Sequence, residues 1–299
     1  MSNPVLDRLQ QYGLRPRKEL GQHFLVDLRV IERLVDLIAP GPGQTILEYG
    51  AGLGVLTGKL LDAGARVVAV ELDDDLARIL DLELGQRAGF RLLHADLARV
   101  SAPEVRAAEG APDLRLVGNL PYQLTSHVLF GVLDLGPALR DAVFMVQREV
   151  AERIVASPGG REYGILSVLL QTWFDVDMAM RVKPGAFVPP PRVDSGVLCI
   201  RPRAGEAPLA WDERQALVRL VKSVFNERRK VLRNTLKKFY GLDDPALTEV
   251  GMASGLDLGR RPESLAVEEF VRLLHALPNE AARGAPGGRA AAGLESGGA

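Results

Sequence analysis

Glycines and an acid that follow two apolar segments have the spacing of a nucleoside-binding site. Gly50, Gly52 and Gly54 stand in the stretch "EYGAGLG", and glycines in such a turn let a ligand approach the backbone at a helix N-terminus. Glu71 follows Gly50 by about 20 residues, the spacing at which a carboxylate accepts hydrogen bonds from a ribose diol. Glycine-rich turns also cap ordinary helices, so this turn alone does not separate a ligand site from a structural turn.

Another acid, Asp96, helps to distinguish a nucleoside cofactor from a dinucleotide. Asp96, in the stretch "HADL", follows the third apolar segment, where a carboxylate could accept from the exocyclic amine of an adenine. The glycine spacing is G-x-G-x-G, not the G-x-G-x-x-G of pyrophosphate-binding turns. Three carboxylates, Glu48, Glu71 and Asp96, suit a cation better than an anion. We therefore expect S-adenosyl-L-methionine, with its sulfonium and ammonium groups, and S-adenosyl-L-homocysteine as product. Each acid alone could instead cap a helix, which is worth about 1 kcal/mol.

The stretch "VGNLPYQLTS" places an amide, a proline and an aromatic ring after the fourth apolar segment. An adenine amine is a poor nucleophile because its lone pair is delocalised into the ring. The Asn119 side-chain oxygen and the Leu120 carbonyl could accept its two protons and favour a pyramidal nitrogen. Pro121 fixes the turn, and Tyr122 offers a stacking face worth roughly 1–3 kcal/mol. Phe187, on the stiff stretch "AFVPPPRVDSG", could be the second wall for an extruded base. An ordinary proline turn and a core phenylalanine are the structural alternatives.

These groups can meet only if the segments before them end at one edge of a sheet. Five apolar segments alternate with helical patterns, as in a parallel sheet with helices on both faces: "QTILEYG", "ARVVAVE", "FRLLHAD", "LRLVGN" and "DAVFMVQ". Ligands of such sheets bind at the carboxyl ends of the strands. "WFDVDMAMRV" and "SGVLCIRP" could close the sheet at its edge. A helical pattern over 25–38 precedes it, and beyond Pro202 the pattern is helical only.

The predicted fold is therefore α/β, a Rossmann-like class I methyltransferase sheet with a small all-helical C-terminal domain. We expect a helical leader with a basic arm over 1–43, the methyltransferase domain over 44–203, a helical RNA-binding domain over 204–278 and a disordered Gly-rich tail over 279–299. The apolar runs are too short to span a membrane, and the single Cys199 excludes an internal disulfide. The four histidines are scattered, so no metal site is expected. We expect a cytoplasmic monomer.

Positive charge is concentrated in one window of a chain whose net charge is −1. Residues 219–238 hold eight basic residues and one acid, Glu227. A solvated helix face usually mixes signs, so this window favours a surface for RNA phosphates. The residues expected to contact phosphate are Arg228, Arg229, Lys230 and Arg233. A second basic group, Arg15, Arg17 and Lys18, lies near the N-terminus.

Nine stretches in this order resemble the small-subunit ribosomal RNA adenine dimethyltransferases, the kasugamycin-resistance family. They are "ELGQHFL", "ILEYGAGLG", "AVELDDDL", "HADL", "GNLPYQLTS", "MVQREVAERI", "FVPPPRVDS", "FNERRKVLRNTL" and "RPESLAVEEF", and they extend over 11–277. The resemblance implies transfer of two methyl groups to each of two adjacent adenines in the 3′-terminal hairpin of 16S rRNA. It also implies action on a late pre-30S particle and an assembly checkpoint role.

The resemblance also assigns roles to residues. His23 and Leu25 would help to close over the cofactor, and Gly50, Glu71, Asp96 and Asn119 would hold it, with Gly52 and Gly54 in the same turn. The adenine pocket would consist of Asn119, Leu120, Pro121, Tyr122 and Phe187. Two positions depart from the family pattern: His23 stands where Asn is frequent, and Ala51 stands where proline is common.

Three other functions remain as alternatives. The related family that methylates an adenine of large-subunit RNA shares the fold and a similar N-[IL]-P-[YF] motif, but the C-terminal stretches favour the small-subunit family. A non-catalytic RNA-binding assembly factor would not need the intact acids and the intact Asn-Leu-Pro-Tyr turn at the ends of all four strands. A nicotinamide dehydrogenase is disfavoured by Asp96 and by the glycine spacing.

Overall fold

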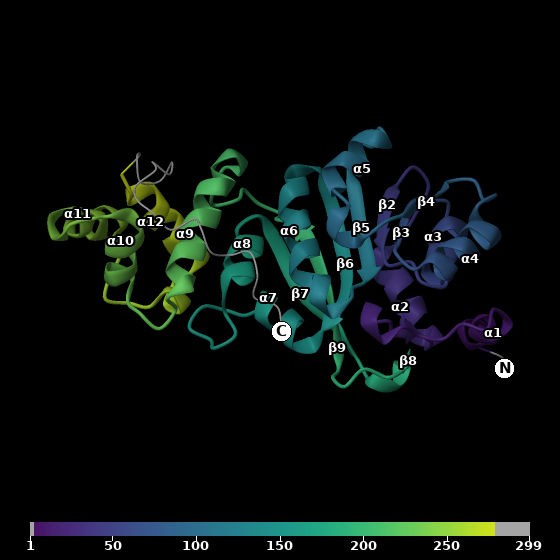
Figure 1. The fold of residues 1–299 in the computed structure, drawn as a ribbon. Coiled ribbons are helices and arrows are strands. Elements are labelled where there is room, and N and C mark those ends of the chain that lie inside the picture. The colour runs from purple at the N-terminus through teal and green to yellow at the C-terminus, as the bar shows by residue number, and fades with distance from the viewer. Residues whose placement is uncertain (1–2, 279–299) are drawn as a thin grey trace. The chain divides into compact units, whose positions relative to one another are not determined.

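The structure, a computed structural model, describes residues 3–278, whose contacts group into two compact units (Figure 1). Within the described residues, the first unit runs to Ala156 and again from Trp173 to Glu206. The second comprises Ser157–Thr172 and the residues from Ala207 onward. The chain thus passes between the units three times, whereas the domains expected over 44–203 and 204–278 would be joined by one crossing. The predicted tail over 279–299 lies outside the described residues.

The first unit is built around a seven-stranded sheet with the order β4-β3-β2-β5-β6-β9-β7. The strands are β2 (Thr45–Tyr49), β3 (Arg66–Glu71), β4 (Phe90–His94), β5 (Leu114–Asn119), β6 (Leu139–Gln147), β7 (Phe174–Val182) and β9 (Ser195–Pro202). β2 to β6 are parallel, and β9 runs antiparallel to both β6 and β7. The predicted parallel sheet and its two closing segments are therefore confirmed.

Helices cover both faces of this sheet because its central strands are apolar on both faces. The helices are α2 (Leu28–Ile38), α3 (Val55–Asp62), α4 (Asp74–Leu84), α5 (Ala102–Ala108), α6 (Thr125–Leu135) and α7 (Arg148–Ile154). Side chains of α2, α3 and α4 pack with Ile46, Val67 and Val143 in one core cluster. The alternate strand residues face the other helices, of which α6 and α7 contact β6 and α5 contacts α6.

A buried ion pair fixes the amino end of the sheet to α2. Arg115, 3% exposed at the start of β5, forms two hydrogen bonds to Asp141, Nε to Oδ1 at 2.7 Å and Nη2 to Oδ2 at 2.6 Å. The same guanidinium donates to the backbone carbonyls of Ile38 and Ala39, where α2 ends. All of its donors face acceptors, which is the condition under which a buried charge is tolerated.

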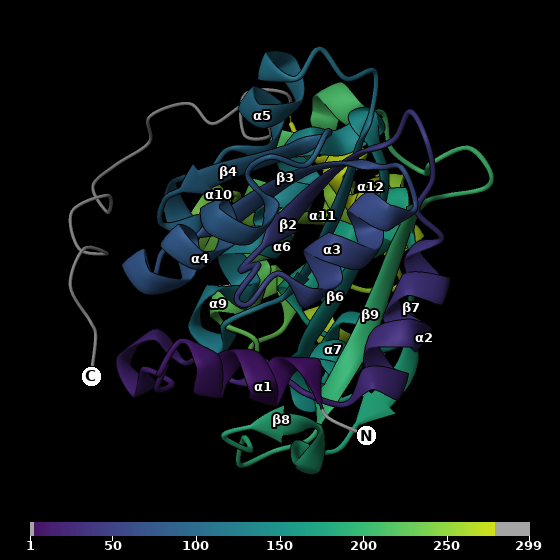
Figure 2. The same ribbon diagram turned by 90° about the vertical axis from the view of Figure 1, so that its right-hand side faces the viewer.

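The N-terminal helix and the segment after it cover the carboxyl end of the sheet. α1 (Pro4–Gln11) packs Val5 and Leu9 against Leu53 of the glycine turn, and it lies alongside α2 and β8 (Figures 1 and 2). Residues 12–25, termed the N-terminal segment, end in β1 (Phe24–Leu25), which pairs antiparallel with β8 (Phe187–Val188). The helix predicted from Leu25 begins at Leu28, because the Asp27 carboxylate caps it and leaves Leu25 in β1.

The regular elements of the second unit are all helices within its described residues, as predicted beyond Pro202. Its helices are α8 (Ile165–Trp173), whose last residue belongs to the first unit, α9 (Arg214–Asn226), α10 (Leu232–Tyr240), α11 (Asp244–Ser254) and α12 (Val267–Ala276). Phe225 of α9 contacts the rings of Tyr163 and Phe270, which ties 157–172 to the later helices. None of the described helices is long and apolar enough to cross a membrane.

Candidate active site

A cavity of about 190 Å³ opens at the carboxyl ends of the parallel strands. Side chains and backbone from the N-terminal segment, the glycine turn and the ends of β3 and β5 line it. The sequence-predicted site residues among its lining are His23, Leu25, Gly50, Gly52, Glu71, Asp96, Asn119, Leu120, Pro121, Tyr122 and Phe187. The strand order of the sheet brings together the groups at the ends of β2, β3 and β5, and the pairing of β1 with β8 adds groups up to 164 residues apart in the sequence, His23 and Phe187.

The three glycines of the turn have different surroundings. Gly50 and Gly52 have φ angles of 73° and 58°, which favour glycine, and both line the cavity. Gly54 also has a positive φ, 70°, but it does not line the cavity. A Cβ at Gly54 would lie 2.7 Å from Leu80 and 3.0 Å from Leu84, so this glycine allows α3 to pack on α4. The structure therefore gives Gly54 a packing role instead of a direct place at the site.

Glu71 is a buried carboxylate that joins two loops of the site. Its Oε2 accepts from Gly52 N at 2.8 Å, and its Oε1 accepts from Leu72 N at 2.9 Å and Asp73 N at 3.0 Å. Burial raises the pKa of Glu71, while these backbone N–H groups oppose the rise by stabilising the ionised form. The carboxylate thus fixes the glycine turn against the connection from β3 to α4.

Glu48 is a second buried carboxyl group of this cavity, and its sequence context predicted no separate role for it. It is 2% exposed, lies two residues before Gly50 and accepts a hydrogen bond from the Thr57 hydroxyl at 2.6 Å. Burial raises the pKa of Glu48 to about 7. Its position at the end of a fully buried strand, directly before the glycine turn, is the sequence signal that identifies it.

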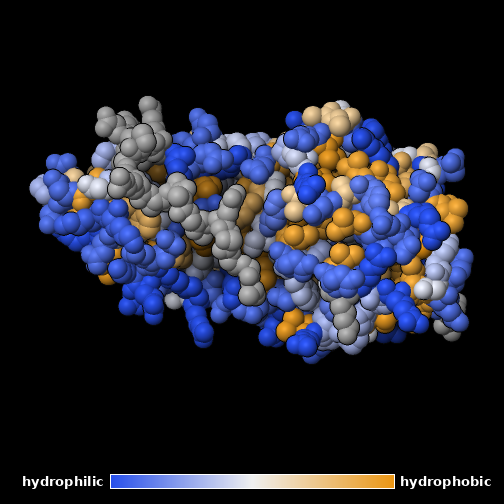
Figure 3. All heavy atoms as spheres, viewed as in Figure 1, coloured by the Kyte–Doolittle hydropathy of each residue, from blue (hydrophilic) through white to orange (hydrophobic). Residues whose placement is uncertain are grey.

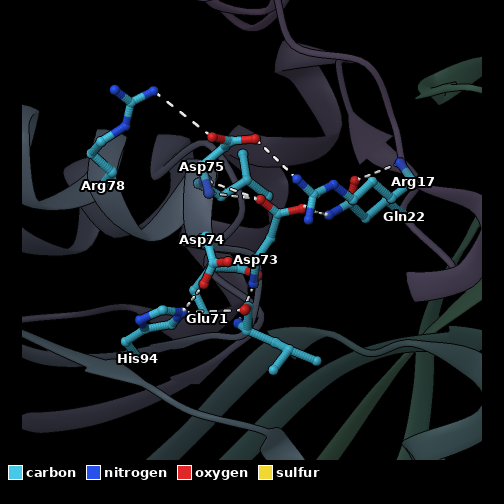
Figure 4. Close-up of polar contacts among 10 residues, drawn as sticks. Arg17, Gln22, Glu71, Asp73, Asp74, Asp75, Arg78 and His94 are labelled. Carbon is cyan, nitrogen blue, oxygen red and sulfur yellow. Dashed lines mark hydrogen bonds and ion pairs between the residues drawn. The ribbon is translucent and has the colours of Figure 1, made fainter.

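Asp96 has a structural role that leaves one oxygen for a ligand. Its Oδ1 accepts from Ala98 N at 2.9 Å and caps a short helix over Leu97–Arg99. No donor within residues 3–278 reaches its Oδ2, and the side chain lines the cavity. The capping alternative and a ligand role are therefore compatible for this acid. His94, at the end of β4, pairs with Asp74 at 3.0 Å outside this lining (Figure 4).

Two oxygen acceptors of the Asn-Leu-Pro-Tyr turn are free in the described part of the chain. Asn119 Nδ2 donates to the His23 carbonyl oxygen at 3.0 Å. Because a carbonyl can only accept, this bond fixes the amide with its Oδ1 turned away from His23. Neither this Oδ1 nor the Leu120 carbonyl receives a hydrogen bond from another described residue. The Leu120 N–H is bonded to Met145 O at 3.0 Å, which holds the turn on β6.

Aromatic rings line the cavity together with this turn. His23 stacks against Tyr122 with ring centroids 6.0 Å apart and an interplanar angle of 27°. The His23 Nδ1 lies 2.7 Å from the Pro189 carbonyl, so this nitrogen carries the proton. Phe187 is 3% exposed, packs into the core cluster with Val143 and also lines the cavity. Its core role and its place in the cavity wall thus coexist.

Comparison with known proteins agrees with this geometry. The family model described as ribosomal RNA adenine dimethylase matches residues 13–274. The chain belongs to the ribosomal RNA adenine dimethylase family. It is 48% identical over 275 residues to the ribosomal RNA small subunit methyltransferase A of Anaeromyxobacter sp. (strain K), covering 89% of this chain and 94% of that protein. The Pseudomonas aeruginosa protein of the same name is 41% identical over 266 residues, covering 89% and 96%.

Two solved structures place the fold in the same context. The 23S rRNA methyltransferase ErmE superposes with a TM-score of 0.64 at 25% identity, covering 85% of this dimethylase and 99% of ErmE. A dimethyladenosine transferase from Plasmodium falciparum superposes with a TM-score of 0.71 at 22% identity, covering 85% and 96%. These structures confirm the expected class I methyltransferase fold. The family model and the relatives confirm the expected enzyme class, an rRNA adenine dimethyltransferase.

The four residues expected to contact RNA phosphate lie in the second unit of the dimethylase and have different surroundings. Arg228 donates to the carbonyls of Gly160 and Arg161, at 3.3 and 2.6 Å. Arg233 pairs with Asp244 at 3.1 Å, and Lys230 lies 3.7 Å from Glu227. Arg229 is exposed and has no polar partner among the described residues. The visible face around α10 is mostly hydrophilic (Figures 1 and 3).

Proposed function

We propose that this dimethyltransferase acts on small-subunit RNA, at two adjacent adenines in the 3′-terminal hairpin of 16S rRNA, and yields N6,N6-dimethyladenosine in a late pre-30S particle. The small-subunit assignment is supported by relatives at 41–48% identity that are named ribosomal RNA small subunit methyltransferase A. An assembly checkpoint role and a monomeric enzyme belong to the same proposal. A ribosomal substrate implies that the enzyme works in the cytoplasm.

The observation that carries the proposed chemistry is the pair of free acceptors, Asn119 Oδ1 and the Leu120 carbonyl. Two acceptors side by side match the two protons of an adenine amine. Accepting both protons turns the amine away from conjugation with the ring and directs its lone pair toward a methyl donor. The Asn119 amide is held by the His23 carbonyl, so its oxygen requires no reorientation when the amine arrives. Tyr122 supplies a stacking face for the base.

The cavity fits S-adenosyl-L-methionine, which supplies an electrophilic methyl group when bound. Glu71 would accept from the ribose hydroxyls in addition to its backbone donors, and the free Oδ2 of Asp96 would accept from the adenine amine. The positive φ angles of Gly50 and Gly52 let backbone approach the ligand without a Cβ. Two buried carboxyl groups, Glu48 and Glu71, line the cavity and, when ionised, suit a cationic ligand. In residues 3–278 no three metal-binding side chains are grouped for a metal; a metal-independent reaction stays a prediction.

The 204–278 region is the proposed RNA-binding part, and its surroundings favour some basic residues over others. Arg229 is the best-placed phosphate contact, since it is exposed and unpaired among the described residues. Lys230, 58% exposed, and Arg233, 45% exposed, can exchange their acidic partners for phosphate. Arg228 can reach RNA only if it gives up two backbone hydrogen bonds. We therefore expect it to contribute less to RNA affinity than Arg229.

The test is methyl transfer from labelled S-adenosyl-L-methionine to undermethylated small subunits, followed by nucleoside analysis of the RNA. Labelled N6,N6-dimethyladenosine confined to the 3′-terminal hairpin is the expected result. Label in large-subunit RNA alone would assign the enzyme to the related family that methylates an adenine of large-subunit RNA. If the protein binds cofactor and particle but transfers no labelled methyl group, it would be a non-catalytic assembly factor.

Two pairs of variants, each a test and its control, probe the assigned roles. Tyr122→Ala should abolish transfer while cofactor affinity stays nearly unchanged, and Tyr122→Phe, which keeps the ring face, should retain activity. A large loss of cofactor affinity in Tyr122→Ala would refute the adenine-pocket assignment. Arg229→Glu with Lys230→Glu should weaken binding to the particle but not to cofactor, whereas Arg140→Glu, an exposed control at the start of β6, should not.

A further inference from the structure

Asp73 uses both oxygens of a nearly buried carboxylate for different parts of the chain. It is 4% exposed and stands in the connection between β3 and α4. Its Oδ1 caps α4 by accepting from Asp75 N at 3.0 Å and Leu76 N at 3.2 Å. Its Oδ2 accepts from Gln22 Nε2 at 3.0 Å and lies 3.3 Å from Arg17 Nε (Figure 4). A helix cap requires only the first oxygen.

The part of the N-terminal segment that docks on Asp73 is itself closed by hydrogen bonds. Gln22 Oε1 accepts from Arg17 N at 2.8 Å, and Gln22 N donates to Arg17 O at 3.3 Å. The Arg17 guanidinium also reaches Asp75, Nη2 to Oδ2 at 3.0 Å. Figure 4 shows this guanidinium between the two carboxylates. A planar guanidinium can pair with both acids at once, which a lysine ammonium does less well.

The docked residues lie in or just before one wall of the cavity. Gly21 and Gln22 line it, as do His23, Phe24 and Leu25, which follow them in the chain. On the other side, the Asp73 backbone N–H is one of the three donors to Glu71. Asp73 therefore contacts the cavity wall through its side chain and the predicted ribose carboxylate through its backbone.

We propose that Asp73 is a positioning residue, which docks Arg17 and Gln22 so that the N-terminal segment closes over the cofactor and couples cofactor binding to that closure. The inference rests on the proposed cofactor site at Glu71. A ligand that needs the closed wall binds only the docked fraction of molecules, so its apparent affinity falls in proportion to that fraction. By the same linkage, the bound ligand stabilises the docked segment.

Asparagine at position 73 separates docking from capping. Asn is as good an N-cap as Asp, so Asp73→Asn retains the bonds from Asp75 N and Leu76 N. It puts a neutral group beside Arg17 and weakens the acceptor for Gln22. Arg17→Met removes the other half of the ion pair and keeps a long apolar stem. The control is Asp27→Asn, since Asp27 caps α2 through two backbone N–H groups and has no ion pair among the described residues.

The two variants also separate docking from simple electrostatics. Asp73→Asn makes the site less negative, and Arg17→Met makes it more negative. An effect of charge alone would move the affinity for a cationic cofactor in opposite directions, because it acts through the sign of the potential. Loss of docking lowers the affinity in both. If the docked fraction falls to roughly 10–30%, the apparent Kd rises about 3- to 10-fold.

The measurements are cofactor affinity by calorimetry and hydrogen exchange of residues 12–25 with and without cofactor. We expect faster exchange of this segment in cofactor-free Asp73→Asn and Arg17→Met, a weaker affinity in both, and no further loss in the double variant. Asp27→Asn should match the parent chain. Unchanged exchange in the single variants, opposite shifts in affinity, or additive losses would each overturn the proposal. If the parent chain does not bind the cofactor, the proposed function is refuted. Docking is still tested in that case, because hydrogen exchange of the cofactor-free chain measures it without the cofactor.

Discussion

Replacing Glu48 with glutamine should stabilise the cofactor-free protein above neutral pH and weaken its cofactor binding. Glu48 is a buried carboxyl whose Oε2 already has a donor, the Thr57 hydroxyl at 2.6 Å. Glutamine retains an oxygen for that hydroxyl and has no charge to bury. The substitution therefore removes the cost of ionisation and leaves the packing nearly unchanged.

The size of the effect follows from the pKa of Glu48, which burial raises from 4.5 to about 7. The folded chain keeps its proton to higher pH than the unfolded chain, so the free energy of unfolding falls as the pH rises from about 4.5 to 7. A shift of this size corresponds to about 3 kcal/mol of lost stability above pH 7, fully restored below pH 4.5. Glu48→Gln should be more stable than the parent chain by about 2–3 kcal/mol at pH 8 and similar to it near pH 4.5.

Urea unfolding of the cofactor-free protein at pH 5, 6, 7 and 8 measures this difference, and an unchanged m-value excludes an altered unfolded state. Glu32→Gln, on the exposed face of α2, is the matched control and should show no such trend. A difference between Glu48→Gln and the parent chain that does not grow with pH would refute the reasoning. A cationic cofactor should favour ionised Glu48, so calorimetry in buffers of different ionisation enthalpy should show proton release on binding near pH 7, absent in Glu48→Gln.

Three further predictions concern stability. Arg115→Met should lower the free energy of unfolding by about 3 kcal/mol, measured in urea, because Asp141, only 16% exposed, loses its ion-pair partner and the carbonyls of Ile38 and Ala39 lose their donor; a loss below 1 kcal/mol would contradict this. Gly54→Ala should lower Tm, since its φ is positive and the new Cβ would meet Leu80 at 2.7 Å, while cofactor affinity of the folded protein stays unchanged; lost affinity without lost Tm would place Gly54 at the site. Glu109→Gln should cost only ~1 kcal/mol or less and depend on salt, because the arginines it pairs with are about half exposed; a larger, salt-independent loss in thermal unfolding would contradict this.

Much of the site could be predicted from sequence because parallel strands end at one edge of a sheet. Once β2, β3, β4 and β5 were recognised by their apolar runs, the side chains that follow them had to converge. Glu71, Asp96 and Asn119 meet at the cavity for this reason. The sequence was sufficient here because the position of each group depends on strand direction alone.

Other features depend on tertiary packing that no local pattern encodes. Gly50, Gly52 and Gly54 alternate in one motif, yet Gly54 does not line the cavity, because α4 lies against it. The basic stretch of the second unit does not reveal that Arg228 bonds to two backbone carbonyls about 67 residues away in the chain. The docking of Gln22 on Asp73 joins residues that are 51 positions apart. Each of these contacts is set by where a loop lies, not by the periodicity of its residues.

The second unit is split in the sequence, and this has a consequence for protein synthesis. Residues 157–172 contribute fully buried side chains such as Tyr163, Leu169 and Leu170, but the helices with which they group begin beyond residue 207. At roughly 5–20 residues per second, a ribosome needs on the order of 5–20 s to synthesise the chain from residue 172 to residue 270. During that interval an apolar stretch has left the ribosome without the partners that will bury it. A fragment starting at residue 207 would lack this stretch altogether, so an isolated C-terminal piece should expose apolar surface and aggregate unless 157–172 is supplied with it.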